Sequence, residues 1–147
     1  MELTHTDSRG KANMVDVGEK AVTVRTARAQ GKIVMQPGTL LLIKDNALKK
    51  GDVLSCAAIA GIGGAKRTSE LIPLCHNLPI EKVEVTFGFE GEDTLVINSY
   101  AKCEYKTGIE MEALCAVSVA ALCVYDMCKA VDRGMRIVDI QLVEKTK

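Results

Sequence analysis

The stretch VEVTFGFEGEDTLVINSYAKCEY, residues 83–105, decides the fold class. In residues 83–89, valine and phenylalanine alternate with polar or small residues, and this period of two predicts a half-buried strand. Gly91-Glu-Asp93 predicts a turn, and residues 95–105 continue as a second strand. The centre of the chain is therefore expected to form an antiparallel hairpin.

On each side of this hairpin the sequence predicts a strand and a helix. Imperfect alternation indicates a strand before the hairpin, and alternation returns near the end of the chain. Asp52 is a predicted N-cap of the first helix, whose glycines allow close packing. The second helix is apolar on nearly all sides, so we expect it to be buried on more than one face. The expected elements are strands at residues 21–35 and 136–144 and helices at residues 52–71 and about 110–131.

The order strand, helix, strand, strand, helix, strand predicts the α+β class. It is the order of the ferredoxin-like βαββαβ fold, an antiparallel sheet with two helices on one face. A chain of 147 residues with 48% hydrophobic content can bury one core, so a single domain is expected over residues 1–147. Residues 1–20 are mostly polar and are expected to form a loosely held N-terminal arm.

Two local features refine these elements. Gly31 lies inside the first strand and predicts a bulge there. Thr107-Gly-Ile-Glu110 has the spacing of a capping box, which would make Glu110 a cap of the second helix.

The composition limits the classes of partner and compartment. With 19 basic and 19 acidic residues the net charge is zero, so no overall field draws the chain to nucleic acid or membrane. The N-terminus has no apolar signal core, and a cytoplasmic location is expected. The six cysteines match neither a zinc-finger nor a disulfide spacing, so we expect buried thiols in a reducing environment.

Asp126 and Lys129 form the strongest chemical feature of the sequence. They lie three residues apart on an otherwise apolar helix, where partial burial would bring both pKa values towards the range useful for proton transfer. An ordinary ion pair on a solvated helix edge accounts for the same spacing. Spacing alone leaves both interpretations open.

His76 and Glu112 are further candidates. His76 lies in a loop between two prolines, which can aim its ring at a ligand, although a loop histidine that only satisfies a backbone group explains the position equally well. Glu112 lies two positions after Glu110, beyond cap geometry, and can face a polar substrate edge.

Two basic groups flank the first predicted helix. They suit a phosphate chain, but charged runs are also typical of solvated faces. Neither a Walker loop nor a GxGxxG motif accompanies them, which excludes the standard nucleotide-binding folds. The groups are Lys44, Lys49 and Lys50 before the helix, and Lys66 and Arg67 near its end.

Motifs spread over nearly the whole chain strongly resemble the molybdenum cofactor biosynthesis protein C family. They occur in colinear order, and the last three long ones are seldom found elsewhere. The motifs are Met14-Val-Asp-Val17, Lys50-Gly-Asp-Val53, Ala60-Gly61, Ala65-Lys-Arg-Thr68, Leu71-Ile-Pro-Leu-Cys-His76, Lys82-Val-Glu-Val85, Thr107-Gly-Ile-Glu-Met-Glu-Ala-Leu114 and Tyr125-Asp-Met-Cys-Lys-Ala130.

The resemblance implies the reaction of a cyclic pyranopterin monophosphate synthase, a lyase. The substrate, a GTP-derived cyclic nucleotide triphosphate, is 3′,8-cyclo-7,8-dihydro-GTP, and the products are cyclic pyranopterin monophosphate and pyrophosphate. The resemblance also implies a homo-hexamer built as a trimer of dimers, with active sites at the dimer interface. No cofactor is required for such chemistry; Mg²⁺ can accompany the triphosphate, but no dedicated metal site is expected.

The resemblance also implies roles for individual residues, carried over motif by motif. Family members often continue into a Gly/Ser/Lys-rich tail, whereas this sequence ends at Glu144-Lys-Thr-Lys147, and if that tail closes the site a reduced turnover is expected. The implied roles are catalytic for Asp126, Lys129 and Lys50, substrate-binding for Leu74, Cys75, His76, Met111 and Glu112, and triphosphate-binding for Lys66 and Arg67.

Two other classes of protein remain as alternatives. A non-catalytic ferredoxin-like anion-binding or regulatory module explains the fold and the basic loop, but not the acid–amine pair. A structural metal protein explains Cys75 and His76, but it needs two more converging ligands.

Helix geometry gives a last expectation. Glu112 and Asp126 lie near one face of the second helix but about 21 Å apart along its axis. If both serve one site, a two-fold related neighbour must supply one of them.

Overall fold

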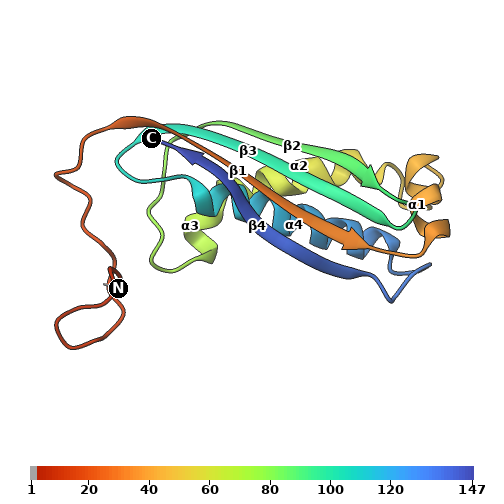
Figure 1. The fold of residues 1–147 in the computed structure, drawn as a ribbon, viewed down its shortest axis with the longest axis horizontal. Helices are drawn as coiled ribbons and strands as arrows, with labels where there is room; N and C mark the ends of the chain where they lie inside the picture. Colours follow the sequence, from red (N-terminus) through yellow and green to blue (C-terminus); the bar gives the residue numbers. More distant parts are fainter. Residues whose placement is uncertain (1–2) are drawn as a thin grey trace.

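A four-stranded antiparallel sheet forms one layer of the molecule, seen in the computed structural model, which describes residues 3–147 (Figure 1). The strands lie in the order β2-β3-β1-β4, and each pairs with its neighbours in antiparallel register. This arrangement confirms the predicted ferredoxin-like fold. The strands are β1 (Thr23–Val34), β2 (Ile80–Glu90), β3 (Thr94–Tyr105) and β4 (Arg136–Thr146).

Two long helices cover one face of this sheet, as predicted (Figure 1). They are α2 (Val53–Lys66) and α4 (Glu110–Cys128), and they pack against each other as well as against the strands. Two shorter helices, α1 (Pro37–Lys44) and α3 (Thr68–Leu71), lie in the connections on either side of α2.

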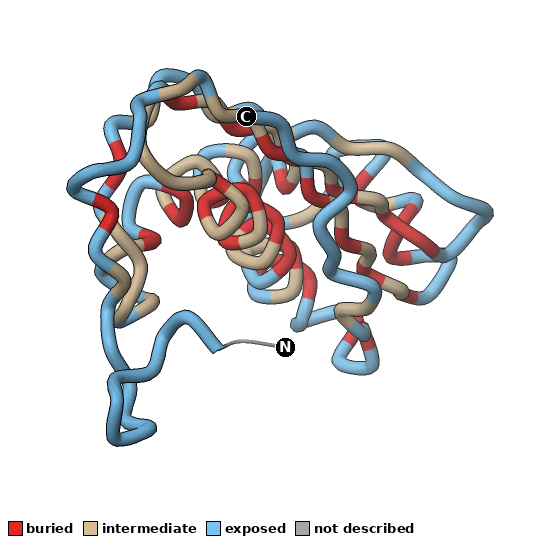
Figure 2. Tube along the Cα trace, turned by 60° about the vertical axis from the view of Figure 1, so that its left-hand side comes forward, coloured by how far each residue is buried: buried red, intermediate tan, exposed pale blue. Residues whose placement is uncertain are grey.

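The core lies between the sheet and the helices, where Figure 2 shows buried residues along α4 and the strands that face it. By length and composition α4 is apolar enough to cross a membrane. However, more than half of its most apolar part is buried inside the molecule, between the sheet and α2. The helix is therefore a core helix, buried on more than one face as predicted.

Glycines on α2 set how closely the two long helices approach. A Cβ atom on Gly61 would lie 2.7 Å from the carbonyl oxygen of Ala116, and one on Gly64 would lie 2.6 Å from the side chain of Val119. Both contacts are too short for a real side chain, so only glycine fits. The helices run antiparallel, which places the start of α2 beside the end of α4.

Gly31 also lies at a close contact. A Cβ atom there would lie 2.6 Å from the side chain of Val117 on α4. The β1–β4 register shifts between Gln30 and Lys32, which confirms the bulge predicted at this glycine.

Two predicted helix ends are wrong, and one helix was not predicted. The first long helix ends at Lys66 rather than near Leu71, because the backbone leaves helical geometry at Arg67 before the separate turn of α3. The second ends at Cys128, not near Val131. The apolar segment before the basic loop is itself a helix, α1, which sequence reasoning did not assign.

The predicted capping box is also wrong. Ile109 occupies the N-cap of α4, and no side chain caps that position. The Glu110 carboxylate instead accepts a hydrogen bond of 2.8 Å from Nζ of Lys145 on β4. A tertiary ion pair has thus replaced the expected local bond. By contrast, Asp52 caps α2 as predicted, accepting from the backbone N–H of Ser55 at 3.1 Å.

The described part of the N-terminal arm, residues 3–20, is mostly exposed and leaves the body of the molecule (Figure 1). Val17 is buried, and Nζ of Lys106 donates to the carbonyl oxygen of Gly18 at 2.7 Å. Met1 and Glu2, which the predicted arm includes, lie outside the described residues.

All six cysteines are free thiols. Cys103, Cys115 and Cys128 are buried as expected, but Cys56 is exposed, and Cys75 and Cys123 are half-buried. The expectation of buried thiols is therefore wrong for Cys56.

Candidate functional site

A carboxylate held between two ammonium groups marks the end of α4. Nζ of Lys129 lies 2.8 Å from one oxygen of Asp126, and Nζ of Lys50 lies 3.2 Å from the other. Lys50 also donates to the backbone carbonyl of Asp126 at 3.2 Å. The antiparallel packing of α2 and α4 produces this arrangement, because Lys50 comes just before α2 begins. The structure thus brings together all three residues to which the resemblance gives a catalytic role.

The electrostatics of this trio differ from the expectation. Partial burial was expected to move the pKa values of Asp126 and Lys129 towards neutrality, but both side chains are more than half exposed. Hydrogen bonds to Lys129 and Lys50 lower the pKa of Asp126, and pairing with Asp126 raises the pKa of Lys129. The ion pairs therefore stabilise the charged forms of both groups. The expectation failed because only some of the apolar neighbours, such as Val124 and Met127, face the core, whereas Asp126 faces outward.

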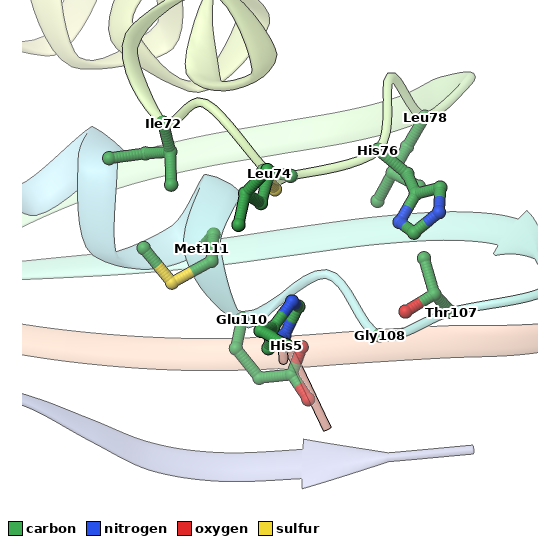
Figure 3. Close-up of a pocket in the computed structure, with 10 residues that line it drawn as sticks. His5, Ile72, Leu74, His76, Leu78, Thr107, Gly108, Glu110 and Met111 are labelled. Atoms are coloured by element: carbon green, nitrogen blue, oxygen red, sulfur yellow. The ribbon is translucent and has the colours of Figure 1, made fainter. Parts of the chain in front are cut away.

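A cavity of about 340 Å³ lies at the opposite end of α4, between its first turn and the loop after α3. Its size is at the lower end of the range for small-molecule sites. Side chains from the loop, the start of α4 and the N-terminal arm converge on it (Figure 3). The lining residues are His5, Ile72, Leu74, Cys75, His76, Leu78, Thr107, Gly108, Glu110 and Met111. Four of the five residues expected to bind substrate line this cavity.

Glu112, the fifth of that set, lies next to the cavity but inside the protein. Glu112 is only 2% exposed, and its Oε2 atom is buried with no hydrogen-bond partner among residues 3–147. Burial raises the pKa of Glu112 to about 7. Burial and the nearby Glu112 charge raise the pKa of Cys75 to about 11. A carboxyl group that titrates near neutrality can both donate and accept a proton under physiological conditions.

Both interpretations of His76, a ring aimed at a ligand and a ring that satisfies a backbone group, agree with its position. Its Nε2 donates to the carbonyl oxygen of Val15 at 2.7 Å, so the ring does satisfy a backbone group. The same ring lines the cavity (Figure 3). The bond also fastens the N-terminal arm, which brings His5 to the cavity.

The expected phosphate-binding residues are dispersed. Lys66 and Arg67 are exposed at the end of α2 and are not among the residues that line the cavity. Lys44 lies over the ring of Phe89, 4.7 Å from its centroid, and so points away from the group to which it was assigned. Of the loop lysines, Lys50 contacts the Asp126 trio, whereas Lys49 is exposed.

Sequence reasoning missed a second basic group. A smaller cavity, of about 150 Å³, adjoins the first through Gly108 and Glu110 and includes Arg25, Lys145 and Lys147. Nε of Arg25 is buried without a hydrogen-bond partner in the described chain. The signal was available in part, because Arg25 falls on the same side of β1 as buried alanines and is the only charged residue there.

The structural metal alternative finds no further support in residues 3–147. Within that range no three His, Cys, Asp or Glu side chains lie close enough to hold one metal ion. Cys75 and His76 are therefore not part of such a group in the described residues.

The two clusters of functional side chains lie at opposite ends of the helical layer. Glu112 stands in the first turn of α4 and Asp126 in its last, fourteen residues or about 21 Å apart along the axis. One end presents a carboxylate between two amines, and the other presents a cavity beside a buried carboxyl group. Neither end alone carries the whole set of predicted site residues.

The charged trio and the separate cavity on a ferredoxin-like domain suit an enzyme that acts on a small molecule. Sequence comparison identifies the family. The model of the MoaC family matches residues 14–147. The chain belongs to the MoaC family.

Full-length relatives agree with this assignment. A protein of Chloroflexus aurantiacus and one of Thermomicrobium roseum, both named cyclic pyranopterin monophosphate synthase, are each 57% identical to this chain. The matches cover 98% of this chain and 89% and 87% of those proteins. A protein of Mycobacterium tuberculosis named cyclic pyranopterin monophosphate synthase 3 is 58% identical over 98% of this chain and 81% of its own length.

Proposed function

We propose that this chain is a cyclic pyranopterin monophosphate synthase of molybdenum cofactor biosynthesis. The substrate would be 3′,8-cyclo-7,8-dihydro-GTP and the products cyclic pyranopterin monophosphate and pyrophosphate, which makes the enzyme a lyase. The observation that carries the proposal is the trio of Asp126, Lys50 and Lys129 in a member of the MoaC family. Three charged side chains from two distant segments of the chain meet there, and packing of the hydrophobic core does not require any of them.

The residue types suit the two parts of the reaction. The cyclic phosphate forms when a ribose-derived hydroxyl attacks the innermost phosphorus and pyrophosphate leaves. The ammonium groups of Lys50 and Lys129 can stabilise the negative charge that develops on the phosphate oxygens, and pairing with Asp126 raises the pKa of Lys129. Asp126 holds both amines in place and can accept a proton as the rings open and reclose.

Glu112 supports the proton-transfer part of the reaction. Its pKa of about 7 allows it to exchange protons at physiological pH, and its buried Oε2 has no hydrogen-bond partner among residues 3–147. Leu74 and Met111 give the adjoining cavity an apolar lining for a flat ring, and Cys75 and His76 add polar atoms at its edge.

The site is proposed to be shared between two subunits. An antiparallel, two-fold related neighbour would bring its Asp126 trio beside the Glu112 and His76 of the first subunit, which closes the gap of about 21 Å within one chain. The same operation produces two equal sites per dimer. We extend this to a hexamer made of three such dimers, as the family resemblance implies.

The triphosphate requires cations along the path between the two clusters. We assign Lys50, Lys66 and Arg67 to it, and the smaller basic cavity with Arg25 and Lys145 lies beside Glu110, at the end of α4 opposite to Lys50. Mg²⁺ can accompany the phosphates, and proton transfer with pyrophosphate release needs no redox cofactor. We place the reaction in the cytoplasm, where six free thiols remain reduced.

Incubation of the purified protein with authentic 3′,8-cyclo-7,8-dihydro-GTP tests the proposal. Mass spectrometry should detect cyclic pyranopterin monophosphate, and phosphorus NMR should detect an equal amount of pyrophosphate. Binding of the substrate without release of pyrophosphate, by a fully folded oligomer with or without Mg²⁺, would identify a non-catalytic binding module instead.

A further inference from the structure

Three sulfur atoms meet between α2 and α4, outside both clusters described above. Sγ of Cys56 on α2 lies 3.8 Å from Sγ of Cys123 on α4, and Cys123 lies 3.9 Å from Sδ of Met127 one turn further along. Nothing in the proposed reaction uses these atoms. Two thiols and a thioether from two elements therefore form a separate cluster of soft donor atoms.

The cluster is open towards solvent and closed towards the core. Cys56 is exposed and Cys123 is half-buried, while Met127 is only 8% exposed. An ion can thus enter from the outside past Cys56, and Met127 forms the apolar floor.

The sulfur separations suit a shared metal ion. With metal–sulfur bonds of about 2.3 Å, as in Zn–thiolate bonds, ligand sulfurs lie about 3.8 Å apart in tetrahedral and about 4.0 Å apart in trigonal geometry. The Cys56–Cys123 and Cys123–Met127 separations of 3.8 and 3.9 Å fall within this range. A three-ligand site also requires Cys56 and Met127 to lie equally close to each other. A disulfide would require the two thiol sulfurs to approach to about 2.05 Å.

The donor types then select the ion. Thioether and thiolate ligands favour Cu(I), whereas Mg²⁺ and Ca²⁺ require oxygen ligands, which the three side chains lack. From the geometry we infer that Cys56, Cys123 and Met127 form a binding site for a single Cu(I) ion. Binding replaces the two thiol protons, which pass to the solvent, so a neutral site becomes a complex with one net negative charge and no change of oxidation state.

The experiment uses the whole oligomer, fully reduced under anaerobic conditions, and Cu(I) buffered by a chromophoric chelator. One Cu(I) per chain should be withdrawn from the chelator, and two thiols per chain should become protected from alkylation. X-ray absorption at the copper edge should show a first shell made of sulfur atoms. Each readout is independent of turnover, so the result stands whether or not the proposed reaction does.

Variants identify the ligands. Cys56→Ser and Cys123→Ser should each abolish chelator-resistant binding, and Met127→Leu, which conserves volume, should weaken it. Cys115→Ala, a cysteine on the same helix outside the cluster, should bind copper like the unaltered protein. Thermal unfolding shows whether each variant is folded.

Three outcomes would overturn the inference. In the first, the unaltered protein retains no more Cu(I) than the Cys56→Ser/Cys123→Ser double variant. In the second, copper treatment leaves no bound metal but lowers the chain mass by two hydrogens, which shows that the thiols have formed a disulfide. In the third, the spectra show oxygen or nitrogen ligands at copper.

Discussion

Nζ of Lys50 lies 3.2 Å from Oδ2 of Asp126, although 76 residues separate the two in the sequence. Lys50 precedes α2, and Asp126 lies in the last turn of α4. Their contact therefore depends on how closely and in which direction these helices pack. The geometry of the proposed catalytic trio is a property of the α2–α4 interface as much as of its own residues.

Asp126→Asn should reduce product formation by about a hundredfold or more, because it keeps the shape of the side chain and removes the ionisable group. Folding and assembly should be unchanged, since the side chain is 59% exposed. Turnover of authentic substrate and thermal unfolding are the measurements. Asp45→Asn, at another exposed aspartate, is the matched control. Near-normal turnover by Asp126→Asn would show that the trio forms structural ion pairs and has no catalytic role.

Gly61→Ala should destabilise the protein by about 1–3 kcal/mol through overpacking against α4. The added Cβ would lie 2.7 Å from a backbone oxygen of Ala116, which cannot move without shifting the helix. Gly63→Ala is the control: its Cβ would contact only the end of the Arg67 side chain at 3.6 Å, and should be neutral or stabilising. Urea unfolding compares them, and equal stabilities would show that the helices are not closely packed at Gly61.

The strands and long helices could be predicted because their signals are local. Alternation of period two fixes the faces of residues 83–89, and the cap at Asp52 involves a residue only three positions away. Helix α1 was missed because Asp132, which accepts hydrogen bonds from the backbone of Gln36 and the hydroxyl of Thr39, lies more than ninety residues further along. The capping box failed for the same reason, since Lys145 holds Glu110.

The candidate site could be predicted by residue type but not by environment. Motif resemblance identified Asp126 and Glu112, yet it gave no means of telling that Asp126 is exposed and Glu112 buried. Burial depends on which face of α4 meets the sheet. Arg25 was missed because its side chain enters the smaller cavity from a strand, where charged residues usually face solvent.

Glu112 should make stability depend on pH in an unusual direction. Its pKa rises from 4.5 to about 7 on folding, so between these values the folded chain holds a proton that the unfolded chain has released. Its contribution to the free energy of unfolding should therefore fall by about 3 kcal/mol as the pH rises through this window.

Glu112→Gln removes this contribution, which isolates it from the other titrating groups. The stability of the variant relative to the unaltered protein should increase between about pH 5 and about pH 8. Urea unfolding at several pH values measures the difference. A constant difference would mean that Glu112 titrates normally and is not desolvated.

Salt dependence should separate the cations from His76. Alanine substitution of Lys50, Lys66 or Arg67 should weaken substrate binding most at low ionic strength, because screening already reduces their attraction to the triphosphate at high salt. His76→Ala should weaken binding almost independently of salt. Lys49→Ala, an exposed neighbour of Lys50, should leave affinity unchanged. Calorimetric titrations over a range of salt concentrations test this. If the affinity of every variant changes equally with salt, the proposed difference between the cations and His76 is wrong.

Co-expression of two inactive variants tests the shared site most directly. One carries substitutions at Glu112 and His76, the other at Asp126 and Lys129, and different tags allow mixed dimers to be purified. In a mixed dimer, one of the two shared sites would contain all four substituted residues and the other site would contain none. Because a two-fold dimer has two equal sites, we predict that mixed dimers regain about half of the unaltered activity. If mass spectrometry confirms mixed dimers and their activity stays as low as that of either parent, the site does not lie between subunits.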